Sequence, residues 1–241
     1  MPSDTRVLRV QAVIPSTPTT RIVRLDLAGS PFAFDAGQAA LVGPAEIDAR
    51  VPYSIASAPR ESAASGHLDF LIKVGPSGKW GQQFDTPTPG MRLGLQGPYG
   101  SFVFPLTPDE RHFLFIAGGT GIAPIRAMIH EARLRGQEGQ MRLLYSAKTA
   151  DDFAYLPELG ELAATSGLDL RLHVTRQGPE LDNRATTAAA GRITAAQLAP
   201  LIDDRQTLCF VCGPESMVAD VPRMLVDLGV DKSRVRIEEW Q

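Results

Sequence analysis

The sequence of 241 residues contains little cysteine, no excess of charge of one sign and no long apolar run. Its two cysteines, Cys209 and Cys212, are too few for a four-thiolate iron–sulfur cluster or a structural zinc site, and they exclude a disulfide framework. The 24 basic and 27 acidic side chains give a net charge of −3, so no polycation is present to neutralise nucleic-acid phosphates. No segment approaches the ~18 apolar residues of a membrane span, and the amino terminus lacks the apolar core of a signal peptide. These absences predict a cytoplasmic globular protein with no nucleic-acid partner and no membrane span.

Short apolar runs with frequent alternation dominate the first hundred residues. The runs VLRVQAVI, TRIVRLDL, HLDFLIKV and MRLGLQ are typical of β-strands. Clusters of glycine and proline separate them at intervals that suit a small antiparallel barrel. We expect residues 1–108 to form this antiparallel β-barrel domain.

After Thr107 and Pro108 the pattern changes to strands that are followed by helices. HFLFIA precedes an expected helix near residues 122–135, MRLLYSA precedes one near 153–164, and TLCFVCG precedes one near 215–228, while LDLRLHV and VRIEEW supply two further strands. This alternation predicts a parallel sheet with helices on both faces, a Rossmann-like α/β domain over residues 109–241. Ligands of this architecture bind at the carboxyl ends of the strands.

Three short motifs contain residue types that suit a phosphorylated, planar ligand. The glycines of Gly118–Gly121 lie between a predicted strand and a predicted helix, where backbone N–H groups can approach a pyrophosphate. Gly97–Phe102 ends the last strand of the all-β part, and Pro52–Ser57 offers a ring for stacking and hydroxyls for hydrogen bonds. Taken singly, each motif also has a structural interpretation, as a tight turn, a β-turn or an ordinary strand, and the β-turn is the stronger interpretation of Gly97–Phe102.

Together, in this order and spacing, the motifs resemble the ferredoxin–NADP reductase type of flavoprotein over nearly the whole chain. The resemblance implies a flavin-binding barrel followed by a nicotinamide-nucleotide domain. It also implies an FAD-dependent NAD(P)H oxidoreductase that passes electrons to a separate ferredoxin, flavodoxin or oxygenase component.

The resemblance assigns flavin contacts in the barrel. Tyr53 and Ser54 match the family's YS pair, whose ring flanks the flavin and whose hydroxyl lies near the reducible nitrogen. The family's GPxGxF turn beside the flavin is matched by Gly97, Pro98, Gly100 and Phe102.

Two departures from the family pattern concern the flavin phosphates. The family has Arg two places before its Tyr, whereas Val51 stands there and Arg50 lies one residue earlier; alternation along a strand predicts that Arg50 points away unless the backbone shifts. The family's GxxSxxL pattern, at the start of a pyrophosphate-binding helix, is retained as Gly78, Gly81 and Phe84 without its Ser, and backbone N–H groups can still bind a phosphate. These changes leave FMN open, while the intact GPxGxF turn favours FAD.

The resemblance also assigns residues of the α/β half. The family's GTGIAP loop under the nicotinamide nucleotide is matched by Gly119, Thr120, Gly121, Ala123 and Pro124, and its CGP motif, whose Cys lies close to the hydride-bearing carbon, by Cys212, Gly213 and Pro214. Glu238 and Trp240 resemble the family's ending, an acid two places before a ring that covers the flavin; the alternative is a solvated acidic tail with a Trp that anchors the last strand. Cys209 matches nothing, so we interpret the CxxC spacing as coincidence and Cys209 as a buried strand residue. The implied catalytic residues are Ser54, Cys212 and Glu238.

The choice of nicotinamide nucleotide depends on charge. A 2′-phosphate needs basic side chains, whereas NAD favours an acid that accepts from the ribose hydroxyls. Basic residues where NADP-using relatives keep them are Lys148, Arg176 and Arg192, with Ser146 and Tyr155 nearby, and the opposing acids are Asp151 and Asp152. Each basic residue can also be a solvated surface charge. We expect NADPH rather than NADH.

Two other functions are compatible with the sequence. A flavin reductase that releases reduced flavin is favoured by the loss of the usual phosphate-binding Arg. A flavin-bearing electron-conduit subunit of a larger complex is disfavoured, because such subunits often carry a cysteine cluster that this sequence lacks.

Overall fold

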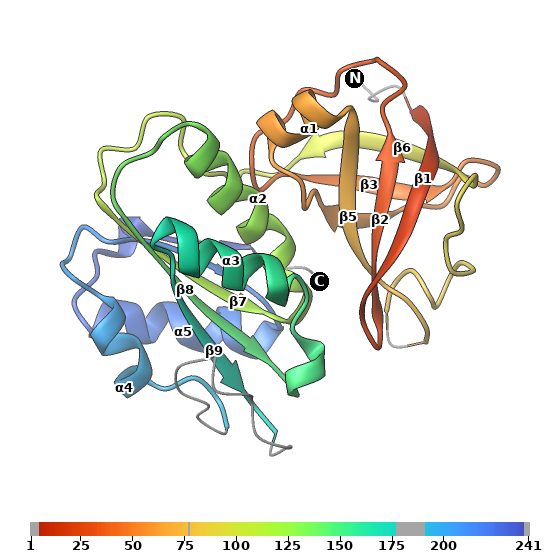
Figure 1. Cartoon of the computed structure of the whole chain (residues 1–241). Coiled ribbons are helices and arrows are strands. Elements are labelled where there is room, and N and C mark those ends of the chain that lie inside the picture. Colours follow the sequence, from red (N-terminus) through yellow and green to blue (C-terminus); the bar gives the residue numbers. More distant parts are fainter. Residues whose placement is uncertain (1–4, 77, 177–190, 239–241) are drawn as a thin grey trace. The chain divides into compact units, whose positions relative to one another are not determined.

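The computed structural model describes residues 5–76, 78–176 and 191–238, which form two compact units (Figure 1). The barrel unit comprises the described residues up to Phe104 together with Arg126–Gly136. The parallel-sheet unit comprises Pro105–Ile125 and the described residues from Gln137 onward. Each unit combines two separate segments of the chain, so these units do not correspond to a single cut in the sequence. The domain boundary expected after Pro108 therefore stays a prediction.

Six antiparallel strands form the sheet of the barrel unit, in the order β4-β3-β6-β1-β2-β5. Their bounds are β1 (Arg6–Thr17), β2 (Thr20–Asp26), β3 (Ala39–Pro44), β4 (Val51–Ser54), β5 (His67–Lys73) and β6 (Arg92–Tyr99). The two edges meet directly after β4, where Ile55 bridges Phe70 of β5 and the Ala56 N–H donates to the Asp69 carbonyl at 2.8 Å. The sheet is thereby closed, and the predicted antiparallel barrel is confirmed.

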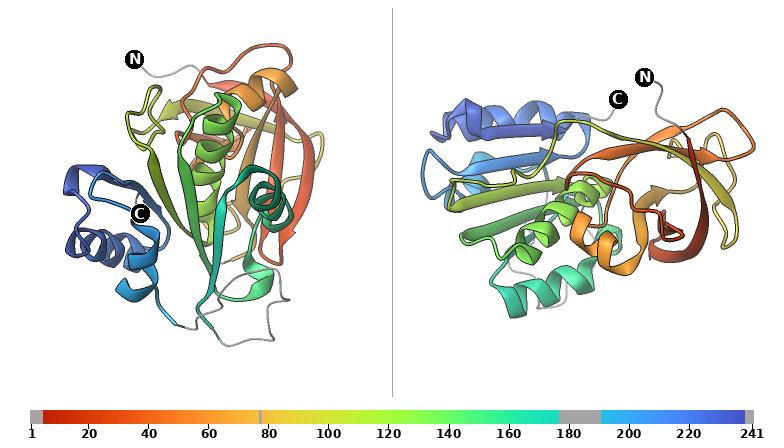
Figure 2. Two further views of the ribbon diagram at one scale, coloured as in Figure 1. Left: turned by 60° about the vertical axis from the view of Figure 1, so that its left-hand side comes forward. Right: turned by 90° about the horizontal axis from the view of Figure 1, so that it is seen from above.

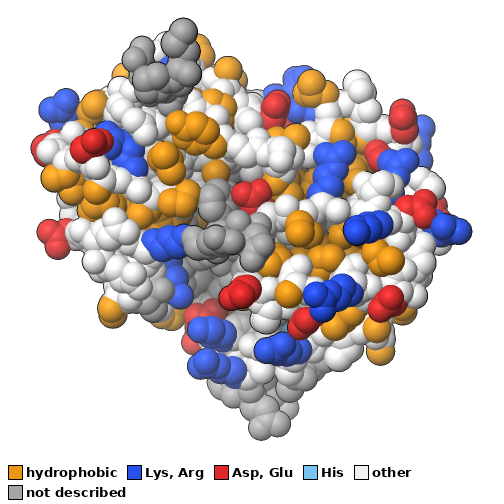
Figure 3. All heavy atoms as spheres, turned by 180° about the vertical axis from the view of Figure 1, so that it is seen from behind, with side chains coloured by type: hydrophobic (Ala, Val, Ile, Leu, Met, Phe, Trp, Pro, Cys, Tyr) orange, Lys and Arg blue, Asp and Glu red, His pale blue; other side chains and the backbone are white. Residues whose placement is uncertain are grey.

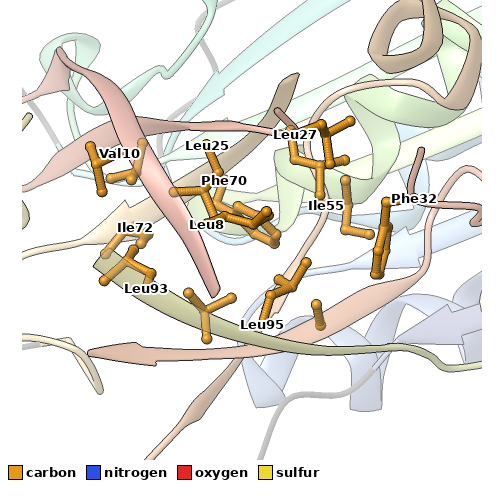
Figure 4. Close-up of a cluster of buried hydrophobic side chains, with 14 of the residues drawn as sticks. Leu8, Val10, Leu25, Leu27, Phe32, Ile55, Phe70, Ile72, Leu93 and Leu95 are labelled. Atoms are coloured by element: carbon orange, nitrogen blue, oxygen red, sulfur yellow. The ribbon is translucent and has the colours of Figure 1, made fainter. Parts of the chain in front are cut away.

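Apolar residues that alternate along these strands fill the interior of the barrel. Figure 4 shows side chains from β1, β2, β5 and β6 pointing toward one another, joined by residues of the connecting segments. The labelled residues are Leu8, Val10, Leu25, Leu27, Phe32, Ile55, Phe70, Ile72, Leu93 and Leu95. Burial of this set is the main favourable contribution to folding of the unit.

A buried ion pair joins two helices within the barrel unit. Arg126 of α2 (Ile122–Leu134) is 5% exposed and donates to the Ala56 carbonyl at 2.8 Å and to both carboxylate oxygens of Glu61, in α1 (Pro59–Ser65), at 3.0 Å. Burial raises the pKa of Glu61, but the Arg126 hydrogen bonds and charge outweigh it, so the pKa lies below its usual value. Buried charges are tolerated when they are paired in this way, and α2 from Arg126 onward accordingly groups with the barrel.

The second unit contains a five-stranded parallel sheet in the order β11-β10-β7-β8-β9. The strands are β7 (His112–Gly118), β8 (Gln140–Ala147), β9 (Asp169–Val174), β10 (Leu208–Cys212) and β11 (Val235–Glu238). Each lies where the sequence predicts a strand. The predicted Rossmann-like architecture is therefore confirmed.

Helices cover both faces of this sheet (Figures 1 and 2). α3 (Leu156–Ser166) lies on one face, and α4 (Ala195–Leu198) and α5 (Glu215–Asp227) lie on the other. On the second face, residues of the central strands pack against these helices; the buried set includes Leu114, Ile116, Leu198, Val218, Val221 and Leu225. Four short 3-10 helices complete the described elements: η1 (Gly119–Gly121), η2 (Ala150–Asp152), η3 (Ala199–Leu201) and η4 (Lys232–Arg234).

The surface agrees with the modest net charge. On the face drawn in Figure 3, basic and acidic side chains are interspersed and not segregated by sign. Within the described ranges, no helix combines the length and the apolar character needed to cross a membrane.

Candidate functional site

The predicted flavin motifs of the barrel unit meet on the two sides of β3. Ser54 of β4 pairs with Ala39, and Ala39 pairs on its other side with Tyr99, which belongs to the Gly97–Phe102 turn. Ser54 is 8% exposed, whereas Tyr53 is half-buried. Strand pairing therefore brings the Tyr53–Ser54 pair and the glycine turn to the same part of the barrel.

The Gly97–Phe102 turn combines open backbone with a buried anchor. Gly97 and Gly100 have φ values of +147° and +98°, in the region that favours glycine. The Gly100 carbonyl accepts a hydrogen bond from the Gln38 side chain at 3.2 Å, and within the described part of the chain no atom would lie within 4 Å of a Cβ at this position. Phe102 is 4% exposed. The turn thus fixes a backbone segment that a ligand can approach closely.

Trp80 links the Gly78–Gly81 segment to Tyr53. The Trp80 ring is fully buried, with its centroid 6.4 Å from that of Tyr53, and its Nε1 donates to the Asp85 carbonyl at 2.8 Å. Burial raises the pKa of Tyr53 to about 12, opposed by a hydrogen bond with the Trp80 backbone. A Cβ on Gly78 or Gly81 would collide with neighbouring backbone, so both glycines are needed for this packing. The segment forms turns and not the expected helix, although the Gln82 N–H donates to the Gly78 carbonyl at 3.0 Å as in one helical turn.

Arg50 lies against β6. Its Nη1 pairs with Asp48 at 3.1 Å, and a Cβ on Gly94 would lie 2.8 Å from its Nη2. The Arg50 side chain is 10% exposed, and its Nε has no hydrogen-bond partner among the described residues. Val51, at the place of the family's Arg, is 3% exposed and belongs to the barrel core. The contacts found for Arg50 do not include Tyr53, so its cofactor contact stays a prediction.

A hollow of about 490 Å³ opens in the barrel unit beside the glycine segment. Its lining residues are Pro44, Ile47, Gly81, Gln82, Gln83, Phe84, Asp85 and Met91. The volume lies within the range of small-molecule sites. Gly81 and Phe84, two residues of the predicted phosphate motif, border this open hollow.

In the parallel-sheet unit, the predicted nucleotide residues lie at the carboxyl ends of the strands. Glu238 of β11 pairs with Cys212 of β10, Cys212 pairs with Ala117 of β7, and Gly118 pairs with Ser146 of β8. This is the edge at which ligands bind in parallel α/β sheets. Residues of four strands, three of which carry a predicted motif, are thus brought into one row by strand register.

The GTG loop and the CGP motif touch through their backbones. A Cβ on Gly121 would collide with the Cys212 carbonyl, and one on Gly118 would lie 2.6 Å from the Pro214 ring. A Cβ on Gly213 would lie 3.1 Å from the Gly118 Cα. Three glycines therefore permit a close approach of η1 to the end of β10. Gly119 has φ +53° with open space around it, and Thr120 is exposed.

Cys212 and Glu238 form a neighbouring thiol and carboxyl pair. Burial, and secondarily the charge of Glu238, raises the pKa of Cys212, so the thiol is neutral near pH 7. Burial raises the pKa of Glu238 to about 7. The pair can therefore offer an S–H group and a carboxyl that gains or loses a proton near neutral pH, but not a nucleophilic thiolate.

Cys209 takes no part in this pair. It is fully buried in β10 within the core cluster, its pKa is raised to about 12 by burial, and neither cysteine forms a disulfide. Residues three apart on a strand point to opposite faces. The interpretation of Cys209 as a buried strand residue is confirmed.

Of the three basic residues expected to bind a 2′-phosphate, two lie close together in the backbone and the third forms an ion pair elsewhere. Lys148 and Arg176 are exposed and follow adjacent strands, where the Arg176 N–H donates to the Lys148 carbonyl at 3.0 Å. Arg192 is instead paired with Asp220 at 3.3 Å, and both side chains are exposed. Tyr155, which precedes α3, is 8% exposed with φ +59°.

Asp152 has a structural role. Its carboxylate accepts from the Thr149 N–H at 3.2 Å and from the Thr149 hydroxyl at 2.9 Å. These bonds cap η2, which weakens the argument that Asp152 recognises the ribose of NADH. Trp240 lies outside the described residues.

Sequence reasoning missed two residues that contact these motifs. Trp80 has no place in the motif that surrounds it. Tyr145 lies in an apolar strand, and its hydroxyl donates to the Gly119 carbonyl at 3.1 Å. Nothing in one sequence distinguishes Trp80 or Tyr145 from core aromatics.

Comparison with known proteins agrees with this geometry. A family model described as an oxidoreductase FAD-binding domain matches residues 8–104, and one described as an oxidoreductase NAD-binding domain matches residues 115–223. Ferredoxin–NADP reductase B of Sorangium cellulosum is 30% identical over 239 residues, which span 96% of this chain and 96% of that protein. The chain belongs to the ferredoxin–NADP reductase-type family of flavoproteins. It is a flavin-dependent NAD(P)H oxidoreductase with an FAD-binding and a nicotinamide-nucleotide-binding domain.

Two further family members are similar. The ferredoxin–NAD(+) reductase component of the alkene monooxygenase system of Xanthobacter autotrophicus is 32% identical over 215 residues, covering 88% of this chain and 63% of that protein. The structure of the Amycolatopsis cytochrome P450 reductase GcoB has a TM-score of 0.83 and 26% identity, covering 98% of this chain and 70% of that one. The chain spans about two thirds of the length of these two proteins.

Proposed function

We propose that the protein transfers electrons from NADPH through bound FAD to a separate one-electron carrier, a ferredoxin, a flavodoxin or an oxygenase component. The observation that carries the proposal is the row at the carboxyl edge of the parallel sheet, where the GTG loop packs on the Cys212–Gly213 peptide beside Glu238. The names of the similar reductases support a separate protein as acceptor. A bound flavin supplies the step between hydride chemistry and single-electron transfer.

The barrel residues fit FAD. Gly100 offers approachable backbone, Tyr53 offers an aromatic ring, and the hollow beside Gly81 offers space for part of a nucleotide. The buried Arg50 Nε has a hydrogen to donate. In the proposed mechanism Tyr53 flanks the flavin ring and Ser54 donates a hydrogen bond to it, while the glycine segments bind the phosphates.

The parallel-sheet residues fit a nicotinamide nucleotide. Gly119, Thr120 and Gly121 open α2, whose amino-terminal N–H groups favour an anion. In the proposed mechanism Cys212 and Glu238 orient the nicotinamide end, with Glu238 able to hold a proton near neutral pH. Orientation of reacting groups is the chief contribution a protein makes in such a transfer.

The preference for NADPH rests on the Lys148 and Arg176 pair. Their backbones are hydrogen-bonded at 3.0 Å and both side chains are exposed, so two cations stand at the ends of β8 and β9. Paired cations suit a 2′-phosphate. The competing acid Asp152 is engaged by Thr149.

The experiment that tests the function is an anaerobic titration of the purified protein with NADPH and with NADH, followed by the visible spectrum. We expect flavin bands that bleach, and that bleach at lower concentration or faster with NADPH. Addition of an oxidised ferredoxin should restore the bands. Protein-bound flavin that neither nucleotide reduces would contradict the proposal.

A second candidate, a reductase that releases reduced flavin, is favoured by one observation. Val51 occupies the core position of the family's Arg, and Arg50 contacts Asp48 and Gly94. Gel filtration of the protein distinguishes the two candidates. Flavin that elutes with the protein supports the proposed function, whereas colourless protein that reduces added flavin supports the second.

A further inference from the structure

Tyr145 joins two segments of the parallel-sheet unit through one hydroxyl. The residue belongs to β8 and is fully buried, and its ring packs edge-on against Phe153 with centroids 4.9 Å apart. The hydroxyl donates to the Gly119 carbonyl at 3.1 Å and accepts from the Ala154 N–H at 3.0 Å. A phenylalanine would fill the same core space, so the hydroxyl serves these two bonds and not packing.

Both segments belong to the predicted nucleotide site. Gly119 begins the GTG loop in a left-handed conformation, and its carbonyl also accepts from the Ile122 N–H at the start of α2. Ala154 directly precedes Tyr155, which is itself left-handed with φ +59°. Glycine adopts this conformation without strain, whereas a non-glycine residue such as Tyr155 keeps it only where surrounding contacts determine it. The Tyr145 hydroxyl is a contact that the two segments share.

We propose that Tyr145 is a positioning residue for the nicotinamide nucleotide. Its hydroxyl sets the spacing between the GTG loop and the Ala154–Tyr155 segment before the nucleotide binds, so that little conformational freedom is lost on binding. The inference rests on the proposed function, because that function makes both segments nucleotide contacts. The inference predicts a change in affinity for the nucleotide and no change in flavin binding, which the proposed function assigns to the barrel unit.

The test compares Tyr145→Phe with a matched control, Thr207→Val. Thr207 is 1% exposed and directly precedes β10, so it lies at the amino-terminal ends of the strands, away from the predicted nucleotide site. Its hydroxyl accepts a hydrogen bond from the Asp204 N–H at 3.4 Å. Both substitutions remove one buried hydroxyl and keep the side-chain shape. The measurements are the Kd of NADP⁺ by calorimetry, the limiting rate of flavin reduction at saturating NADPH, flavin content and thermal midpoint.

We expect Tyr145→Phe to raise the Kd of NADP⁺ about tenfold, because the two segments lose the hydrogen bonds that hold them in place before binding. The limiting rate of flavin reduction should change less than about twofold. Thr207→Val should lower the thermal midpoint without changing the Kd. Equal Kd values for Tyr145→Phe and wild type, or an equal rise in both variants, overturn the inference while the proposed function stands. A wild-type protein that binds no nucleotide overturns both.

Hydrogen exchange of the nucleotide-free protein tests the inference separately. If the hydroxyl orders the Ala154–Tyr155 segment before binding, the Ala154 amide, which donates to it at 3.0 Å, should exchange slowly in wild type and faster in Tyr145→Phe. Rapid exchange of this amide in nucleotide-free wild type contradicts the inference, whether or not Tyr145→Phe folds.

Discussion

At the scale of single residues, Cys212 and Cys209 provide a comparison within one strand. Both are fully buried thiols with raised pKa values, but only Cys212 lies at the carboxyl edge beside Glu238. We expect Cys212→Ala to lower the rate of flavin reduction by NADPH on the order of 10- to 100-fold, because the nicotinamide end loses a positioning contact. Flavin content should stay unchanged. Stopped-flow reduction checks this, and Cys209→Ala, which alters only the core cluster, should reduce at the wild-type rate.

The raised pKa of Glu238 predicts a stability that changes with pH. Burial raises its pKa from 4.5 to about 7, so the folded state favours the neutral carboxyl. The associated stability is fully present below pH 4.5 and is lost as the pH rises through about 7. We expect Glu238→Gln to be at least as stable as wild type near pH 8, with the difference shrinking toward about pH 5. Urea unfolding at both pH values measures this.

The same variant tests the proposed role of Glu238 in the reaction. Wild-type flavin reduction should change with a midpoint near pH 7, the pKa of Glu238, and Glu238→Gln should remove that step because the amide does not titrate. A step of unchanged midpoint in the variant would assign the pH dependence to another group.

Lys148 and Arg176 determine the nucleotide preference in the proposed function. Lys148→Ala and Arg176→Ala should each raise the KM for NADPH about tenfold and leave the KM for NADH nearly unchanged, since only NADPH carries the 2′-phosphate. Arg205→Ala is the control, because this exposed cation pairs with Asp231 at 2.9 Å. Equal losses with both nucleotides would contradict the NADPH preference.

The sequence predicts site residues that belong to contiguous motifs, but not those that act through contacts formed in the folded state. Cys212 and Gly121 belong to contiguous motifs, so their residue types identify them. Tyr145 and Trp80 act through contacts with residues 26 and five positions away in the chain, and such contacts exist only in the folded state. The capping bonds from Thr149 to Asp152 are likewise visible only in the structure, because residue types alone do not show which acid is engaged.

At the scale of elements, the contact between η1 and β10 depends on glycine. A Cβ on Gly121 would collide with the Cys212 carbonyl, which is backbone and cannot move cheaply. We expect Gly121→Ala to weaken NADP⁺ binding by about tenfold or more and to lower stability by about 1–3 kcal/mol. Gly160→Ala, at an exposed position of α3 with open space, should instead add about 0.5–1 kcal/mol. Calorimetry measures the Kd of NADP⁺ for the two variants, and urea unfolding measures their free energies of unfolding.

The elements that the sequence predicted best are those with buried strands and long periodic helices. α2 and α5 lie within a few residues of their expected ranges, whereas α3 begins at Leu156 and not near residue 153. The reason is local: Tyr155 is left-handed and Pro157 suits the first helical turn. The short α1 and α4 were missed, since seven and four residues carry too little periodicity to detect.

At the scale of the whole molecule, chain continuity links the two units through α2. Its first four residues group with the parallel-sheet unit and the rest with the barrel unit. A helix is costly to interrupt, because a new end exposes unpaired backbone groups. The division expected after Pro108 assigns all of α2 to one domain, and it stays a prediction.

The last prediction concerns this link. In a Trp240→Phe variant, Trp80 is the sole tryptophan and reports on the barrel core. In the proposed function NADP⁺ binds the parallel-sheet unit, and at 100 times its Kd a ligand that binds only the folded state stabilises that state by about 2.7 kcal/mol. Because α2 belongs to both units, we expect NADP⁺ to raise the thermal midpoint of Trp80 fluorescence together with that of far-ultraviolet circular dichroism. If the Trp80 midpoint stays fixed while the other rises, the two units unfold independently and α2 breaks near Arg126 at little cost.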